Sequence, residues 1–162
     1  MGPVIYGAWE FAPVLRSVTV SKLGITWRFP YVSVTPSHSI NFSAYFSQNS
    51  GDNGLTFLGI PDPAGGSSPV GALFLVSVSD NRMSSIGTLL GHQARTQTAI
   101  IVNDTTVMAR NLCQDDTGHN AESQGFLIQT TSTACVWLAP NDKLHILTED
   151  AEYACASIVR IR

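Results

Sequence analysis

The stretch Ser132-Thr-Ala-Cys-Val-Trp-Leu-Ala-Pro-Asn-Asp-Lys-Leu-His-Ile-Leu-Thr148 carries the strongest signal for the fold. Apolar residues alternate up to Leu138 and alternate again from Leu144, on either side of Pro140–Asp142. Period-two alternation predicts two strands, and Pro, Asn and Asp supply the backbone geometry of a tight turn. We therefore predict a strand–turn–strand hairpin. This pattern contains no catalytic signature.

Short segments of the same kind fill the rest of the chain. Further strands are predicted at 15–21, 24–29, 39–47, 55–60, 70–79, 83–90, 97–102, 105–110, 125–130 and 154–162. Asn103-Asp104 separates two of these segments as a hairpin turn. No long segment repeats apolar residues at helical spacing, so we expect no helix. About ten short antiparallel strands indicate an all-β sandwich or barrel.

The predicted strand at 39–47 has two distinct faces. On one face lie the side chains of Ile40, Phe42, Ala44 and Phe46. Tyr45 lies on the opposite, polar face. This tyrosine is therefore expected at the surface, where it is available to a partner.

The composition indicates a surface with little charge. Charged residues make up 13% of the 162-residue chain, and Lys22 and Lys143 are its two lysines. Soluble globular chains usually carry about 25% charged residues. Uncharged polar surface is easily buried at a protein contact, because few ions lose their water. We therefore expect one domain that forms a homo-oligomer.

Charge and hydropathy exclude two classes of partner. The net charge is −3 and no stripe of Lys or Arg exists, so nucleic acid is not an expected partner. No apolar run approaches the roughly 20 residues that span a bilayer, so membrane insertion is not expected. Residues 1–6 show no signal peptide. The protein is then not secreted by that route, begins after processing, or is a piece of a longer chain.

The three cysteines, Cys113, Cys135 and Cys155, cannot all pair within one chain. Cys135 and Cys155 fall on predicted strands, and we expect their side chains to face the core as small hydrophobic groups. Three free thiols are favoured over a disulfide framework, which remains the alternative. Free thiols favour synthesis in a reducing compartment.

Four segments resemble the trimeric jelly roll of tumour necrosis factor and of complement-q-type globular heads. They are Ile40–Ala44, Ala99–Met108, Ala121–Gln129 and Thr133–Ile146. The ending Ala156–Arg162 is more similar to phage, viral and bacterial members, and no Gly-X-Y collagen stalk precedes the domain. The resemblance implies a jelly-roll β-sandwich at 37–162, preceded by a β extension at 1–36 that packs on the sandwich or on a neighbouring protomer.

The resemblance also implies a homotrimer with aromatic side chains between its protomers. Tyr45, Trp137 and Tyr153 are the candidates for this interface. The alternatives for these aromatic residues are the core of a single protomer and stacking on the faces of sugars.

An acidic segment is the candidate metal site. It contains Asp115, Asp116, His119 and Glu122, and hard oxygen ligands suit calcium. Asp115 and Asp116 are the proposed ligands, although the spacing matches no defined calcium loop. The alternatives are a solvated acidic loop and no cofactor at all. Asp116-Thr-Gly118 copies the aspartic-protease tripeptide, but its polar surroundings indicate a turn.

The expected function is recognition without catalysis. Loops at 48–54, 61–69 and 112–123 are expected at one end of the sandwich, because loops on rigid sandwiches carry binding. The candidate ligand-binding residues are Asn49, Asp52, Asn53, Asp115, Asp116, His119 and Glu122. The expected ligand is a cell-surface receptor or glycan, and the expected setting is a virion, phage or cell-surface appendage, outside the cell.

Two alternatives remain open. One is a secreted complement-q-like or cytokine-like ligand of an animal, which glycan at the Asn103-Asp-Thr105 acceptor would favour. The other is a structural component of a virion or capsid. The chain contains no nucleophile elbow or phosphate-binding loop, so we do not expect an enzyme.

Overall fold

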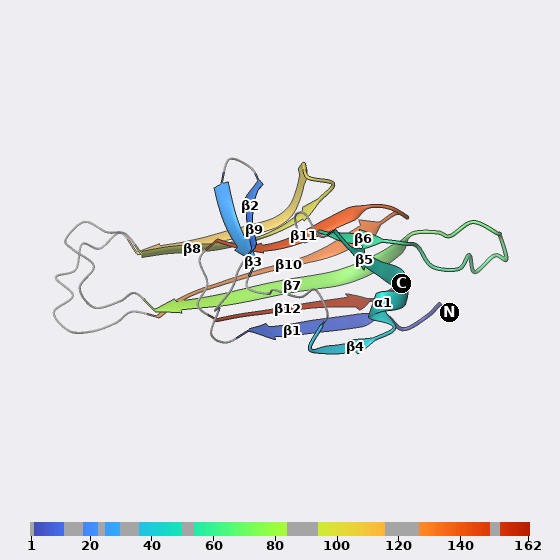
Figure 1. Cartoon of the computed structure of the whole chain (residues 1–162), viewed down its shortest axis with the longest axis horizontal. Coiled ribbons are helices and arrows are strands. Elements are labelled where there is room, and N and C mark those ends of the chain that lie inside the picture. Colours follow the sequence, from blue (N-terminus) through green and yellow to red (C-terminus); the bar gives the residue numbers. More distant parts are fainter. Residues whose placement is uncertain are drawn as a thin grey trace.

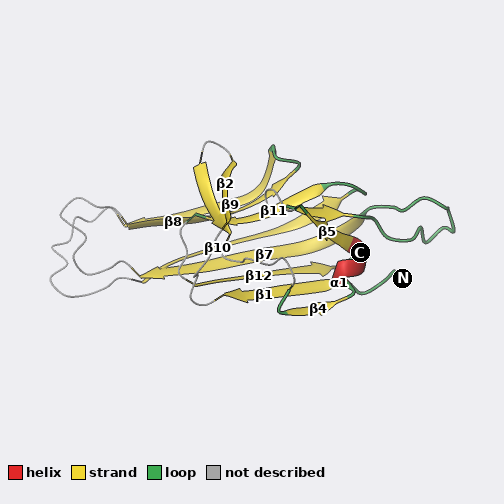
Figure 2. Ribbon diagram, viewed as in Figure 1, coloured by secondary structure: helices red, strands yellow, loops and turns green. Residues whose placement is uncertain are grey.

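The chain folds as two antiparallel β-sheets packed face to face, with one short helix at their margin in the residues described (Figure 1 and Figure 2). The structure is a computed structural model that describes residues 2–11, 18–22, 25–29, 36–49, 54–83, 94–115, 127–149 and 153–162. Its elements are β1 (Tyr6–Phe11), β2 (Val18–Lys22), β3 (Ile25–Phe29), β4 (His38–Ile40), α1 (Phe42–Tyr45), β5 (Phe46–Gln48), β6 (Leu55–Phe57), β7 (Ala72–Met83), β8 (Ala94–Val102), β9 (Thr106–Asp115), β10 (Leu127–Leu138), β11 (Lys143–Thr148) and β12 (Tyr153–Arg160). The all-β prediction is confirmed.

The order of the strands identifies the sandwich as a jelly roll. Sheet A has the order β10-β7-β12-β1-β4. In sheet B, β11 pairs with β8 along Leu144–Thr148, so β6 and β3 share its other edge, while β9 continues the sheet beyond β8. From β6 onward, each successive strand crosses to the other sheet, except at the β8–β9 hairpin. Alternation of this kind between two sheets defines the jelly roll.

The two strands of the stretch 132–148 lie in different sheets. β10 pairs with β7 along its whole length, and β11 pairs with β8. The strand–turn–strand prediction is confirmed, but its hairpin pairing is wrong: the turn arches from one sheet to the other. Asn141 has φ 72° there, its N–H donates to Phe57 O at 2.6 Å, and Asp142 Oδ2 accepts from Ala139 N at 2.8 Å. The turn is therefore tied to β6 as well as to itself.

The predicted hairpin around Asn103-Asp104 is confirmed. Both residues have left-handed φ, 52° and 64°, which matches the right-handed twist of the flanking strands. The register shifts between Ile100 and Ile101, so Met108 is an extra residue on β9. β9 then continues to Asp115, so the first residues of the predicted 112–123 loop are strand.

The strand predicted at 39–47 is wrong. The segment forms β4, helix α1 and β5, and α1 also contradicts the expectation of no helix. Asn41 has φ 55°, and its amide donates to Val4 O at 2.9 Å, which stops β4. Phe42 and Phe46, four residues apart, are both buried and stack at 4.9 Å. Ile40 and Ala44 are exposed instead of sharing their face.

An aromatic cluster fills the interior beside α1. Phe46, Phe57 and Phe74 lie 5.1 to 5.4 Å apart, and Trp9 meets Phe42 edge-on at 5.2 Å. These rings come from β1, α1, β5, β6 and β7, so both sheets and the helix converge on them. Edge-to-face pairs of this kind add to the free energy of burial.

Farther along the strands, small polar side chains replace the aromatic rings in the interior. Thr96 Oγ1 donates to Asp80 Oδ2 at 2.9 Å, and the hydroxyls of Thr98 and Ser132 lie 2.7 Å apart. All four side chains are buried. Buried polar groups are tolerated where they bond to each other. The hydroxyl bonds therefore join the two sheets where the aromatic cluster ends.

The cysteine prediction is partly wrong. All three cysteines are free, as favoured, but Cys135 and Cys155 are exposed. Val136 and Leu138 face the interior, and the period of two then directs Cys135 outward. Cys155 lies between the buried Ala154 and Ala156 and points outward for the same reason.

Replacing Phe57 by Ala should test the aromatic cluster. Phe57 is fully buried between Phe46 and Phe74, so Phe57→Ala should lower the free energy of unfolding by about 3 to 5 kcal/mol. Urea denaturation measures this change. The matched control is Leu58→Ala, because Leu58 is 41% exposed and its truncation should cost well under half as much. Equal losses for both variants would contradict the packing described.

Candidate functional site

Among the described side chains, the outward face of sheet A is uncharged over three adjacent strands, from the edge strand β10 through β7 to β12. The described side chains on this face are Gln129, Thr131, Thr133, Cys135, Trp137, Leu73, Leu75, Ser77, Ser79, Asn81, Cys155, Ser157 and Val159. Glu10 of β1, which pairs with Cys155 of β12, is the carboxylate that borders this face. We call this set of side chains the sheet A face.

An apolar patch lies within the sheet A face. Trp137 is 58% exposed and pairs with Leu73 on β7, while Leu75 is 37% exposed between Cys135 and Val159. The indole lies so close to Gly71 that a Cβ there would be 2.7 Å from Trp137 Cζ2. The ring therefore rests on backbone and presents its remaining surface outward.

A second apolar surface lies on β9, which pairs with β8 at one edge of sheet B. Val107, Met108 and Leu112 are between 38% and 49% exposed. The bulge at Met108 disturbs the ladder here. We call these three side chains the β9 edge. A single chain therefore carries two apolar surfaces of different composition on different sheets.

The three predicted interface residues do not share one surface. Trp137 lies on the sheet A face. Tyr45 ends α1 and is half-buried against the aromatic cluster, rather than standing on the polar face of a strand. The backbone of Tyr153 begins β12, and its side chain lies outside what the structure describes.

Most predicted ligand-binding and metal residues fall outside the described part of the chain. Those residues are Asp52, Asn53, Asp116, His119 and Glu122, together with the side chain of Asp115. Asn49 is described, and its amide donates to Thr56 Oγ1 at 3.2 Å. Within the described ranges, no three His, Cys, Asp or Glu residues gather as metal ligands would.

The predicted loops do not all lie at one end of the sandwich. The 61–69 loop lies at one end of the sandwich, whereas β9 ends with Asp115 at the opposite end (Figure 1). The expectation of one shared end is therefore wrong. Its cause is the length of β7, β8 and β9, which carry the chain along the whole sandwich between the two loops.

The 61–69 loop is exposed but internally bonded. An Ile60–Val70 bridge closes its base. Asp62 accepts from Ala64 N at 2.9 Å and from Gly66 N at 3.1 Å, and Gly65 has φ 84°. Carboxylate-capped turns hold a loop in one shape without tertiary contacts. The loop is thus a preformed projection.

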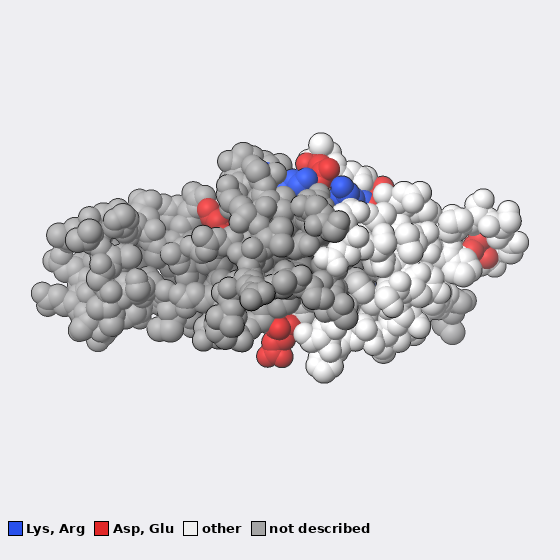
Figure 3. All heavy atoms as spheres, viewed as in Figure 1, with Lys and Arg blue, Asp and Glu red and all other residues white. Residues whose placement is uncertain are grey.

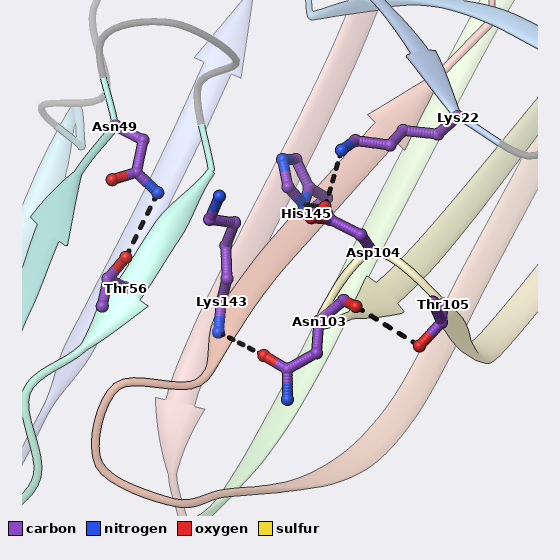
Figure 4. Close-up of polar contacts among 8 residues, drawn as sticks. All are labelled: Lys22, Asn49, Thr56, Asn103, Asp104, Thr105, Lys143 and His145. Carbon is purple, nitrogen blue, oxygen red and sulfur yellow. Dashed lines mark hydrogen bonds and ion pairs between the residues drawn. The ribbon is translucent and has the colours of Figure 1, made fainter.

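Charged side chains gather instead on the sheet B side of the sandwich. In Figure 3 the blue Lys and Arg atoms lie together among the red ones, while most other described atoms of this view are white. Lys22 Nζ donates to Asp104 Oδ1 at 2.6 Å, and His145 Nδ1 lies 3.6 Å from the same oxygen (Figure 4). The hydrogen bond from Lys22 holds the pKa of Asp104 below its usual value, and the charges of His145 and Lys143 act in the same direction. Both lysines of the chain therefore surround one aspartate.

His145 is fully buried in this cluster. The alternation of β11 directs it away from Leu144 and Ile146, but the side chain is covered and not exposed. A Cβ on Gly54 would lie 2.9 Å from both His145 Nε2 and Lys143 Cδ, so the two side chains close over that glycine. The four elements that meet here are β2, β6, β11 and the β8–β9 turn.

The side chain of Asn103 is part of the fold. Its Oδ1 accepts from Lys143 N at 2.9 Å, and its Nδ2 donates to Asp142 Oδ1 at 2.9 Å. Nδ2 is the atom that an N-linked glycan would occupy.

One cavity of about 180 Å³ opens beside α1. Phe42, Phe46 and Leu55 form its apolar lining, and three serines are among its polar groups. Pockets that hold drug-sized ligands measure roughly 300 to 1,000 Å³. The cavity therefore falls short of a site for an average small-molecule ligand.

No helix among the described residues has the length and hydrophobicity that crossing a bilayer would demand.

Comparisons with known proteins leave the chain without a family. No family model and no curated protein matches the sequence. Among solved structures, the chain is similar to the structure of Eiger TNF from S. frugiperda, with a TM-score of 0.45 and 12% identity over 98% of this chain and 94% of that one. The jelly roll described above rests on the strand order, not on this similarity.

Two substitutions at Asn103 should separate its backbone and side-chain roles. Asn103→Gly keeps the left-handed φ but loses the bonds to Lys143 and Asp142, which should cost about 1 to 2 kcal/mol of unfolding free energy. Asn103→Ala also forces a Cβ into left-handed φ and should cost about 1 kcal/mol more. Urea denaturation compares the two variants, and equal stabilities would contradict the turn geometry.

Proposed function

We propose that the chain is a non-enzymatic recognition domain that assembles with two identical copies and binds a cell-surface receptor or glycan. The sheet A face is the observation that carries the proposal. Soluble monomers rarely expose contiguous apolar patches without a partner. A broad face that joins Trp137, Leu75 and Val159 without any charge has the composition of an interface core.

A contact between the sheet A face and the β9 edge of the next copy would close a ring, and a trimer is the smallest ring that it allows. The two surfaces differ, so a contact between them is heterologous, whereas a two-fold dimer uses one surface on both subunits. A heterologous contact that closes forms a ring, and the smallest such ring has three members. The positions of the exposed side chains, Trp137 on one surface and Leu112 on the other, support this arrangement.

The 61–69 loop supports the recognition role. Asp62 holds it in shape before any ligand arrives, so binding would order few new residues. A trimer presents three copies of the loop, and three weak sites gain avidity on a multivalent surface such as a cell. Display on a virion, phage or cell-surface appendage suits this mode of binding.

The assembly should depend on the sheet A face. Wild-type protein should elute as a trimer in size-exclusion chromatography with light scattering at micromolar concentration. Leu75→Glu places a charge in the centre of the face and should yield folded monomers, because a buried unpaired charge is costly.

The matched control for assembly is Leu58→Glu. Leu58 has similar exposure but follows β6 of sheet B, so this variant should remain trimeric. A monomeric wild type, or a Leu75→Glu variant that keeps the wild-type mass, would refute the assembly.

Recognition should depend on the shape of the 61–69 loop. Wild-type protein should bind members of a glycan array or intact cells, and Asp62→Ala should weaken that binding at least tenfold while the trimer persists. Ser68→Ala is the control in the same loop. If wild-type trimers bind neither glycans nor cells, the recognition role is wrong and a structural role in a particle is favoured.

A further inference from the structure

The cavity beside α1 lies at an open side of the sandwich. β4 is the outermost strand of sheet A on this side, β5 is the outermost strand of sheet B, and α1 connects the two. A single helical turn therefore joins the margins of the two sheets here. The cavity of about 180 Å³ opens to the surface at this connection, and we call it the α1 pocket.

Three serine hydroxyls converge on the α1 pocket from three successive elements. Ser39 comes from β4, Ser43 from α1 and Ser47 from β5, and all three residues are exposed. Within the described part of the chain, none of these side chains forms a hydrogen bond. Because a hydroxyl can both donate and accept, the three groups are available to a ligand that carries hydroxyls of its own.

The floor of the α1 pocket is apolar and held in place before any ligand arrives. Phe42, Phe46 and Leu55 line it, and all three are buried. The two phenyl rings stack at 4.9 Å, and Phe46 also packs against Phe57 and Phe74 of the aromatic cluster. A site with a fixed shape spends little binding free energy on its own ordering.

The charge and the size of the α1 pocket narrow the class of ligand. The described side chains that line it are uncharged, so a charged ligand would leave its water there without gaining a counterion. Its volume is below the roughly 300 to 1,000 Å³ of pockets for drug-sized molecules, which leaves room for about one pyranose ring. A hexopyranose combines a face of C–H groups with a rim of hydroxyls, and the pocket combines an apolar floor with hydroxyls.

We propose that the α1 pocket binds one neutral sugar ring, the terminal hexose or N-acetylhexosamine of a cell-surface glycan. The C–H face of the ring lies against the floor formed by Phe42 and Phe46, and its hydroxyls bond to the three serines. This inference rests on the proposed recognition function and deepens it, because it names the class of ligand and the place where that ligand binds.

The α1 pocket shares one end of the sandwich with the 61–69 loop (Figure 1). Leu58 N donates to Tyr45 O at 2.8 Å, which ties the end of α1 to the segment that leads into the loop. When the terminal ring of a glycan occupies the pocket, its remaining rings extend into solvent at this same end. The loop can then contact them, in agreement with the role proposed for it.

Saturation-transfer difference NMR of the full chain tests the α1 pocket. The probes are the methyl glycosides of glucose, galactose, mannose and N-acetylglucosamine. We expect saturation to reach at least one of them with a dissociation constant in the millimolar range, because about a dozen non-hydrogen atoms supply limited binding free energy. Protons on the C–H face of that sugar should receive the most saturation.

Variants of one serine locate the binding. Ser43→Leu fills the pocket from an exposed position and should reduce the affinity for the sugar at least tenfold. Ser43→Ala removes one hydroxyl and should weaken binding about three- to tenfold. Ser68→Leu is the matched control, because Ser68 is an exposed serine of the 61–69 loop outside the pocket, and this variant should bind like the wild type.

Two results would overturn the pocket directly: no saturation of any of the four glycosides by the wild type, or wild-type affinity in Ser43→Leu. If Ser43→Leu does not fold, Ser47→Leu fills the pocket from β5 and decides in the same way. Cell binding that Ser43→Leu abolishes, without saturation of any glycoside, also contradicts the proposal, because the pocket then receives a group of a protein receptor.

The outcome for the α1 pocket is distinguishable from that for the proposed function. If wild-type trimers bind cells or arrayed glycans and no glycoside is saturated, the recognition role stands and the pocket is wrong. If a glycoside is saturated and Ser43→Leu abolishes the effect while cells and arrays stay blank, the pocket binds sugar and the role at a cell surface is wrong.

Discussion

Sheet A buries one face against sheet B, and a single chain leaves its other face uncovered. Phe74, Val76 and Ile158 face sheet B and are fully buried. On the other side of the same strands, Leu75 and Val159 stand among threonines, serines and an exposed tryptophan. A sheet with one face in water normally alternates apolar and charged or strongly polar residues. The assembly proposed above would cover this second face, on which the thiols of Cys135 and Cys155 lie.

The two sheets differ in the charge of their surfaces. The contacts of Asp104 with Lys22 and His145 lie on the sheet B side, as do the Arg110–Gln97–Glu149 bonds. Sheet A leaves a face without charge exposed on the described strands β10, β7 and β12, while sheet B holds the ion pair of Lys22 with Asp104. The uncharged and the charged surfaces therefore lie on different sheets.

Local patterns in the sequence predicted most strands, and failed where distant residues decide the outcome. Alternation located β10 and β11 correctly. It could not show that β10 pairs with β7 and β11 with β8, because each partner lies more than thirty positions away in the sequence. These two pairings place β10 and β11 in different sheets. The 39–47 segment was misassigned because apolar residues at Phe42 and Phe46 satisfy both period two and the i, i+4 spacing of a helix turn. Cys135 could have been placed outward from the alternation itself, since it is out of phase with the apolar residues that alternate up to Leu138. Lys22, Asp104 and Lys143 are far apart in the sequence and come together only in the folded sandwich, so no local pattern predicts that both lysines lie near Asp104.

Thiol labelling of the native protein tests the central claim most directly. Cys135 and Cys155 are exposed on a single chain, and both lie on the sheet A face. If identical copies cover that face, a maleimide should modify both thiols far more slowly in the native protein than after unfolding in urea, as peptide mass spectrometry can show. Prompt modification of both thiols in the native protein, as fast as in the unfolded chain, would mean that the face is open to solvent and that the account is wrong.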